Sequence, residues 1–227
     1  MNASLRRLSL SIALVLLIAS CTEMGSQGTA EVIQNLQKTN LDSSQFPWTR
    51  GLADGRTKRW DIERDGLIPI KFNGSTLAQE ATTEIETVLH MSLFDTTSIA
   101  NLPDNLIVRG IIVREGTAVG PRGVVTRSTC GNVSVLPETT DYPEDFYNSE
   151  GRINTRLYVS LSSKKCTASL EIAIHEFGHA LGLGKHFLGF GSINAAIAPS
   201  FWQVLYTLYN NDVGTFAEDL EIKLLDL

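Results

Sequence analysis

The sequence has few cysteines, few histidines and no run of basic residues. Its 227 residues include 19 Lys and Arg against 25 Asp and Glu, which gives a formal net charge of −6. An acidic chain without a basic cluster is a poor candidate for nucleic-acid binding, so we expect no nucleic-acid partner. The same lack leaves no polybasic segment that could hold the chain on anionic lipid. Attachment to a membrane would therefore have to be covalent.

The first 21 residues have the form of a bacterial export signal. Two arginines precede an apolar run over residues 8–18, and small residues then lead to Cys21. The run is too short for a permanent membrane span, so we expect residues 1–20 to be a cleaved signal peptide. The ending Ile-Ala-Ser-Cys resembles a lipobox, which implies a lipid anchor on Cys21 and a place in the bacterial cell envelope. The residue after Cys21 is Thr22 and not Asp. By resemblance to Gram-negative lipoproteins, this favours sorting to the outer membrane. An ordinary secretory signal cut nearby is the alternative.

The other two cysteines are Cys130 and Cys166. In an exported protein they lie in an oxidising compartment, where a disulfide can persist. We therefore predict a disulfide between them. Two unpaired buried thiols are the alternative.

From residue 21 to residue 45 the sequence is polar and lacks apolar periodicity, so we expect a flexible tether with a short helix around residues 31–37. One domain then extends from about residue 46 to residue 227. Alternation and apolar runs predict strands over residues 66–72, 105–115, 123–126, 132–136 and 152–161. Helical spacing predicts a long first helix from Ser75 or Thr76 to Leu93, a motif helix from about Thr167, and a C-terminal helix capped by Ser200. These elements indicate an α+β fold around a twisted mixed sheet.

Three of the four histidines lie within the stretch HEFGHALGLGKHF, residues 175–187. Positions four apart on a helix share one face, so His175 and His179 can bind the same metal ion. Glu176 would lie beside that ion, where it can accept a proton from a water molecule. We expect zinc (Zn²⁺), because imidazole suits it and catalytic zinc sites keep a position open for water. His90, in the first helix, fits a packed or surface residue better than a ligand.

This stretch resembles the metzincin zinc proteases, and among them the matrixins, whose signature is His-Glu-x-x-His-x-x-Gly-x-x-His. The order of predicted elements also fits, so the similarity would cover residues 60–215. The resemblance implies a metzincin-like fold, His175 and His179 as zinc ligands, and Glu176 as the general base. It also implies that the strand near residues 132–136 binds the substrate backbone.

The third histidine of the signature is displaced. Lys185 occupies its place and His186 follows one residue later. A protonated lysine has no lone pair to offer a metal. We expect His186 to be the third ligand, because the two glycines of the turn can accommodate one extra residue. A downstream carboxylate, at Glu218 or Glu221, is the alternative.

Two further family features are missing. Metzincins place a methionine beneath the metal, yet no methionine follows Met91, so Ile193 or Ile197 would have to fill that place. Matrixin zymogens block the metal with a prodomain cysteine, and none lies between Cys21 and Cys130. We therefore expect no latency of the cysteine-switch type.

The sequence thus predicts a lipid-anchored zinc endopeptidase of the bacterial envelope that acts on a protein or peptide substrate. Its cleavage preference would depend on a pocket beside the metal, lined by Phe187, Leu188 and Phe190. The alternative is an envelope lipoprotein that keeps the protease fold for binding and has no activity.

Overall fold

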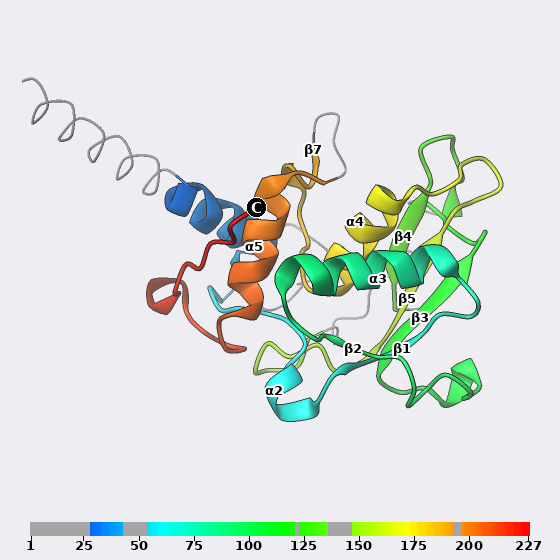
Figure 1. The fold of residues 1–227 in the computed structure, drawn as a ribbon, viewed down its shortest axis with the longest axis horizontal. Helices are drawn as coiled ribbons and strands as arrows, with labels where there is room; N and C mark the ends of the chain where they lie inside the picture. Colours follow the sequence, from blue (N-terminus) through cyan, green and yellow to red (C-terminus); the bar gives the residue numbers. More distant parts are fainter. Residues whose placement is uncertain (1–27, 43–53, 121–122, 136–146, 193–196) are drawn as a thin grey trace, which may run out of the picture.

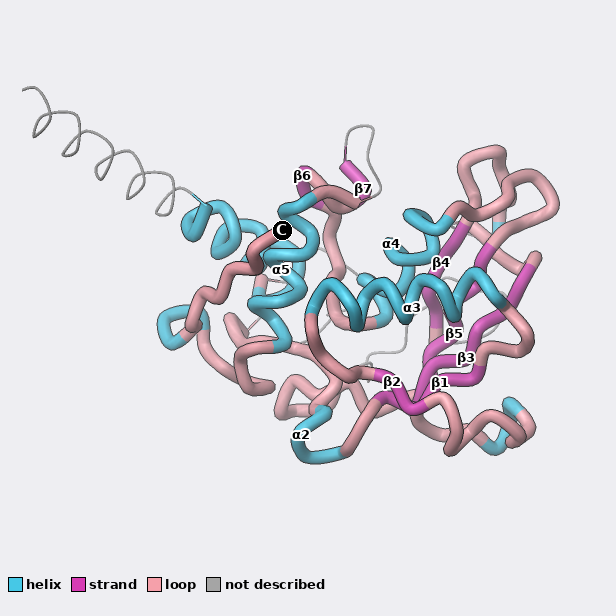
Figure 2. The backbone as a smooth tube through the Cα atoms, in the orientation of Figure 1, coloured by secondary structure: helices cyan, strands magenta, loops and turns pink. Residues whose placement is uncertain are grey.

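The computed structural model describes residues 28–42, 54–120, 123–135, 147–192 and 197–227. It contains a five-stranded sheet in the order β2-β1-β3-β5-β4. The strands are β1 (Ile68–Lys71), β2 (Phe94–Asp95), β3 (Gly110–Glu115), β4 (Gly131–Ser134) and β5 (Arg156–Leu161). The α-helices with defined bounds are α2 (Ile62–Asp65), α3 (Thr76–Leu89), α4 (Leu170–Ala180) and α5 (Pro199–Tyr209). Helices α3 and α4 lie side by side over one face of the sheet (Figures 1 and 2).

The sheet is mixed. Strands β2, β1, β3 and β5 run parallel to one another, whereas β4 is antiparallel to β5 and forms the edge of the sheet. A short pair, β6 (Phe187–Leu188) and β7 (Gly191–Ser192), lies apart from it. Mixed α/β structure around a mixed sheet is compatible with the α+β fold expected from the sequence.

Both faces of the sheet are covered, because alternate residues of a strand point to opposite sides. Ile111 and Val113 of β3 face the main core under the helices. Between them in sequence, Ile112 points to the other face, where it forms a smaller cluster with Tyr158 and two residues of the loop after β2. The side chains on the helix side of the sheet therefore form the surface against which α4 packs.

Helices α3 and α4 begin at serines that cap them. The Ser75 hydroxyl accepts a hydrogen bond from Ala78 N, and Ser169 does the same for Ile172 N. Such caps satisfy backbone N–H groups that the first helical turn leaves without a partner. The two expected helix starts near residues 75 and 167 are thus close to those observed.

The C-terminal helix begins differently from the expectation. Ser200 is not its cap: Pro199 is the first helical residue and Ala198 precedes it. Proline suits this position because its fixed φ is helical and its missing N–H is not needed there. The Ser200 hydroxyl donates instead to Leu188 O, at 2.7 Å.

The expected strand over residues 123–126 is wrong. These residues form no strand, and a turn follows in which side chains bond to the backbone. Thr126 N donates to the Thr129 hydroxyl at 2.9 Å, and Ser128 N donates to the Thr126 hydroxyl at 3.3 Å. Hydroxyl side chains that bond locally in this way compete with strand pairing.

Residues 28–42, which the sequence assigns to the tether, are folded. They form a helix over residues 28–36 followed by a π-helical turn, η1 (Gln37–Leu41). Val32, Leu36 and Leu41 are buried in the main core. In Figure 1 this blue segment lies beside α5 and the C-terminal residues.

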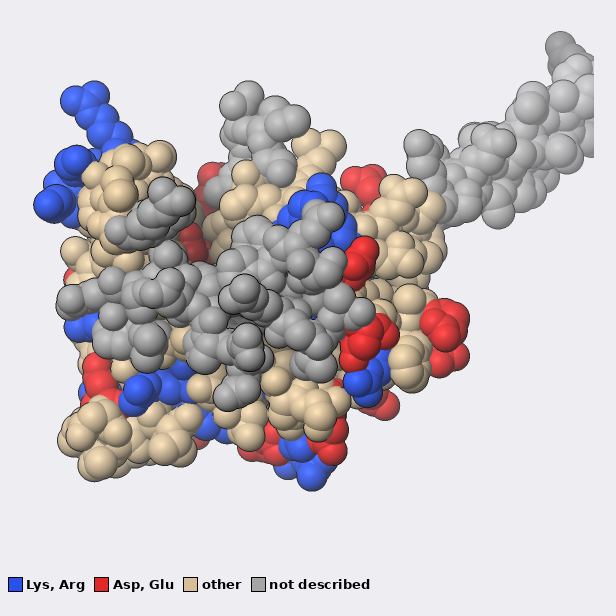
Figure 3. Space-filling view, turned by 180° about the vertical axis from the view of Figure 1, so that it is seen from behind, with Lys and Arg blue, Asp and Glu red and all other residues tan. Residues whose placement is uncertain are grey.

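Basic and acidic side chains are mixed on the described surface seen from behind, in several small groups (Figure 3). Across the part of the chain that the structure describes, no helix is long and apolar enough to cross a bilayer.

Candidate metal centre

Three histidines converge at the C-terminal half of α4. His175 and His179 project from α4, and His186 comes from the turn that follows the helix. The Nε2 atom of His186 lies 3.1 Å from Nε2 of His175 and 3.2 Å from Nε2 of His179. Their ligand atoms all lie within 4.8 Å of one another, close enough to hold one metal ion.

A tight turn brings His186 back to the helix. Leu183 N bonds to Gly178 O at 3.0 Å, and Gly182 has a φ of 116°, which L side chains rarely adopt. A Cβ at Gly182 would also lie 2.6 Å from Lys58 O. Glycine is therefore required there, and the extra residue of the turn moves the displaced histidine into place.

The imidazole of His179 is oriented by a hydrogen bond on the side away from the other histidines. Its Nδ1 lies 2.6 Å from Leu183 O, a carbonyl that can only accept, so Nδ1 carries the proton and donates. The Nε2 atom then presents its lone pair to the cluster, as a metal ligand must. Burial, with His175 and His186 nearby, holds the pKa of His179 well below its usual value, and burial also lowers that of His186. Neutral imidazoles are the form that binds metal.

Phe190 forms the floor beneath all three histidines. Its ring centroid lies 4.4 Å from that of His175, 4.8 Å from that of His179 and 5.5 Å from that of His186. The side chain is fully buried and stacks on Phe201 of α5. The expectation that Phe190 lines a substrate pocket is therefore wrong, because the ring supports the histidines from inside the fold.

The other residues expected in that pocket differ in exposure. Phe187 is buried, whereas Leu188 is 63% exposed. Of the two isoleucines considered for the place beneath the metal, Ile197 packs against the core and pairs with Phe190 through a backbone bridge. Ile193 lies outside the described residues.

Glu176 packs against the start of the edge strand β4. A Cβ at Gly131 would lie 2.5 Å from Glu176 Cγ and 2.6 Å from Oε1, so only glycine leaves room for the carboxyl group. Glu176 is 7% exposed, and burial raises its pKa to about 8. A buried carboxyl group with a raised pKa, one residue after His175 on α4, is able to take up and release a proton near neutral pH.

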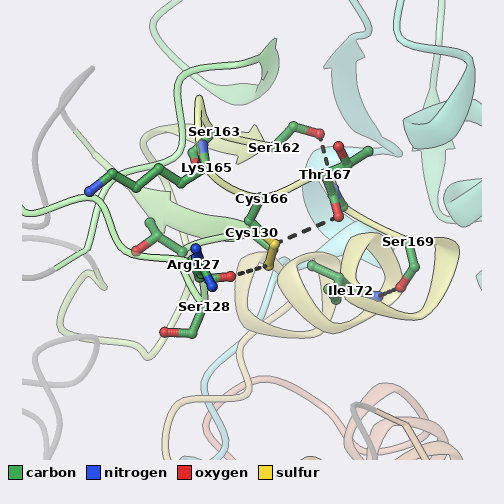
Figure 4. Close-up of a disulfide and its surroundings, with 12 residues drawn as sticks. Arg127, Ser128, Cys130, Ser162, Ser163, Lys165, Cys166, Thr167, Ser169 and Ile172 are labelled. Atoms are coloured by element: carbon green, nitrogen blue, oxygen red, sulfur yellow. Dashed lines mark hydrogen bonds between the residues drawn. A yellow bond between two sulfur atoms is a disulfide. The ribbon is translucent and has the colours of Figure 1, made fainter.

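Gly131 follows directly after Cys130, which forms a disulfide with Cys166 (Figure 4). The Cα atoms of the two cysteines are 4.9 Å apart, and this is the pairing expected from the sequence. Cys166 lies in the loop just before α4, so the bond ties the first residues of β4 to the start of the motif helix.

The remaining candidates lie outside the cluster. His90 is an exposed residue at the C-terminal end of α3. The alternative third ligands, Glu218 and Glu221, are exposed and do not belong to the histidine cluster. Asn132, in the expected substrate strand, lies in β4, and its side chain accepts a hydrogen bond from Val119 N at 2.8 Å.

The motif residues could be found from their spacing, but Gly131 and Phe190 could not be given their roles. Phe190 follows His186 closely, yet nothing in the sequence shows that the chain reverses and places its ring beneath the imidazoles. Gly131 follows Cys130, for which the sequence predicts a disulfide, and this is the signal in the sequence that the position of Gly131 is constrained. Comparison with known families, curated proteins and solved structures gives no significant match.

Proposed function

We propose that this protein is a zinc-dependent endopeptidase of the metzincin type, in which His175, His179 and His186 bind zinc and Glu176 is the general base. The observation that carries the proposal is the cluster of three Nε2 atoms, with the Glu176 carboxyl group on the next position of the same helix. Three histidine ligands together with a carboxyl group on the motif helix are the residue set of a hydrolytic zinc centre.

The two nitrogen–nitrogen distances at His186 are compatible with one zinc ion. Two nitrogens bound to one tetrahedral zinc ion at about 2.0–2.1 Å lie about 3.3 Å apart. The distances of 3.1 and 3.2 Å between the imidazole nitrogens are close to this value. His186 is half-buried whereas His175 and His179 are buried, so the cluster is reachable from the side of His186. Three protein ligands leave the fourth position of a tetrahedral ion for water or substrate.

When bound, zinc supplies Lewis acidity that polarises a peptide carbonyl and lowers the pKa of water to about 7. Glu176 takes the proton of the attacking water and delivers it to the leaving amine nitrogen. Gly131, at the start of β4, leaves the room that the Glu176 carboxyl group occupies. We further propose that an extended peptide substrate lies along β4, the last strand in the order of the described sheet.

Replacing Glu176 by Gln tests the mechanism. The variant should retain zinc, measured by mass spectrometry on the purified soluble domain, and should lose chelator-sensitive cleavage of casein. A loss of about 100-fold or more is expected when a general base is removed. The matched control is Glu171→Gln, an exposed carboxyl group in the first turn of the same helix, which should leave cleavage unchanged.

Unchanged proteolysis in Glu176→Gln would refute the general-base assignment. Wild-type protein that binds zinc with full occupancy but cleaves neither casein nor denatured protein would instead favour the binding lipoprotein. The third ligand is tested separately: His186→Ala should lose most of the zinc, whereas His90→Ala, which removes an exposed histidine, should keep it. Full metal content in His186→Ala would show that another group is the ligand.

A further inference from the structure

The C-terminal end of α4, which delivers His186, is held by side chains from distant parts of the chain. The last carbonyls of a helix have no partner within it and need one from elsewhere when they are buried. Four successive carbonyls here each have a different partner. Ala180 O accepts from Trp60 Nε1, Leu181 O from the Tyr209 hydroxyl, Gly182 O from Asn40 Nδ2 and Leu183 O from His179 Nδ1.

Asn40 is the partner that comes from the N-terminal segment. The side chain is 0% exposed, and its Nδ2 donates to Gly182 O and to Lys58 O, both at 2.7 Å. Its Oδ1 accepts from Lys58 N at 2.9 Å. Next to it, Thr39 O accepts from Gly184 N at 2.8 Å. Residues 39 and 40 therefore hold both glycines of the turn at once.

The glycines cannot fix this turn by themselves. Glycine has a wide range of backbone conformations and no side chain that could pack, so its geometry in a folded protein depends on external contacts. Besides the bonds that the turn makes to α4, its hydrogen bonds at Gly182 O and Gly184 N are both to η1, and Lys58, which lies close to Gly182, is itself bonded to Asn40. Two residues after Gly184, the chain presents His186 to the other two histidines.

We propose that Asn40 is a positioning residue for the metal centre. Together with Thr39 O, it fixes the Gly182–Gly184 turn and thereby sets the place of the His186 imidazole. Residues 39 and 40 of η1 then help to position a ligand of the metal site. This inference rests on the metal site of the proposed function and not on peptide hydrolysis.

The test compares Asn40→Ala and Asn40→Asp with Gln37→Ala. Asp has the size of Asn and keeps the acceptor for Lys58 N, while its carboxylate no longer donates to Gly182 O. Gln37 is an exposed residue of the same π-helical turn, so its replacement controls for changes in the segment itself. Zinc affinity is measured by competition with a chelator, and the cobalt-substituted protein is examined by visible absorption. Both Asn40 variants should bind zinc about 10-fold or more weakly, with a changed cobalt spectrum. Gln37→Ala should match the wild type.

A double-mutant cycle separates positioning from general stability. Each variant is compared in the wild-type and in the His186→Ala background, at a temperature where circular dichroism shows the apo-protein folded. If Asn40 acts through His186, its replacement should cause no further loss of affinity once His186 is gone. An equal loss in both backgrounds would overturn the proposal, and so would wild-type affinity and spectrum in Asn40→Asp. If the protein binds zinc without cleaving peptides, the proposed protease activity is refuted, but the effect of Asn40 on zinc affinity can still be measured.

Discussion

Phe190 shows how one residue supports three histidines. Its ring contacts His175, His179 and His186 from the buried side and stacks on Phe201 behind them. An apolar surface in this position excludes water from the inner side of the metal site and limits rotation of the imidazoles.

Replacing Phe190 by Leu should weaken zinc binding, while its loss of unfolding free energy should be the same as that of a control substitution elsewhere in the core. We expect about a 10-fold loss of zinc affinity, because the histidines lose the flat surface against which they pack. The matched control is Phe177→Leu, since Phe177 is equally buried in α4 but packs against Phe94. Both variants should lose about 1–2 kcal/mol of unfolding free energy in urea. Equal zinc affinities of the two variants would contradict a role for Phe190 at the metal.

A substitution at Gly131 tests whether the position of the Glu176 carboxyl group matters for activity. A methyl group at this position would lie 2.6 Å from Glu176 Oε1 and would force the carboxyl group to move. Gly131→Ala should therefore lower kcat about 10-fold or more in a casein assay, while zinc content stays at the wild-type level. Gly28→Ala, where a Cβ would meet nothing within 4 Å, is the control. Unchanged kcat in Gly131→Ala would show that the contact does not direct the base.

Sequence reasoning located the residues of this site that are related by local geometry. His175 and His179 share a face because of the helical repeat, and Glu176 follows from its neighbouring position. His186 could be inferred as the third member because two glycines in the turn can accommodate one extra residue. Asn40 could not be found in this way, since its bonds to Gly182 O and Lys58 O depend on how distant segments pack.

At the scale of elements, the position of α4 is fixed from both ends. The Cys130–Cys166 disulfide ties the loop before α4 to β4, and the side chains of Trp60, Tyr209 and Asn40 hold its last carbonyls. Helices α3, α4 and α5 and the parallel strands β1, β3 and β5 were predictable because their apolar patterns extend over enough residues, whereas the two-residue strand β2 and the short helix α2 were not predicted. The pair β6 and β7 was not, because each strand has two residues and carries no periodic pattern.

The disulfide should contribute measurably to stability. Its cysteines are 36 residues apart, and a bond that closes a loop of this size typically adds about 2–4 kcal/mol to the free energy of unfolding. The variant with Cys130→Ser and Cys166→Ser should lose that amount in urea unfolding under oxidising conditions. A dithiol reductant should destabilise the wild type to a similar extent and leave the double variant unaffected. An effect of the reductant on the double variant would mean that it acts elsewhere.

At the scale of the whole molecule, folded structure is already present at residues 28–42, which the sequence predicts to be part of a tether. Three apolar residues of this stretch, Val32, Leu36 and Leu41, are buried in the main core. The polar composition of residues 21–45 favoured a tether and gave no indication of this burial. Their spacing is helical, but in so polar a segment three residues do not stand out from a tether. If Cys21 carries the lipid, the segment between it and the helix at residue 28 spans at most about 25 Å, at 3.3–3.6 Å per residue. The metal centre would then work on substrates close to the membrane surface.

The proposed lipid anchor can be tested independently of the proposed protease activity. Expressed in a bacterium from its own signal, the wild type should be recovered with membranes, and Cys21→Ser should be recovered in the soluble or secreted fraction. The variant lacking Cys130 and Cys166 should stay with the membranes, because those cysteines lie in the folded domain. Released Cys21→Ser protein should retain its zinc, since the segment that holds the Gly182–Gly184 turn begins after the anchor. Membrane recovery of Cys21→Ser would refute lipidation at this residue, and loss of zinc on release would show that the anchor itself supports the metal centre.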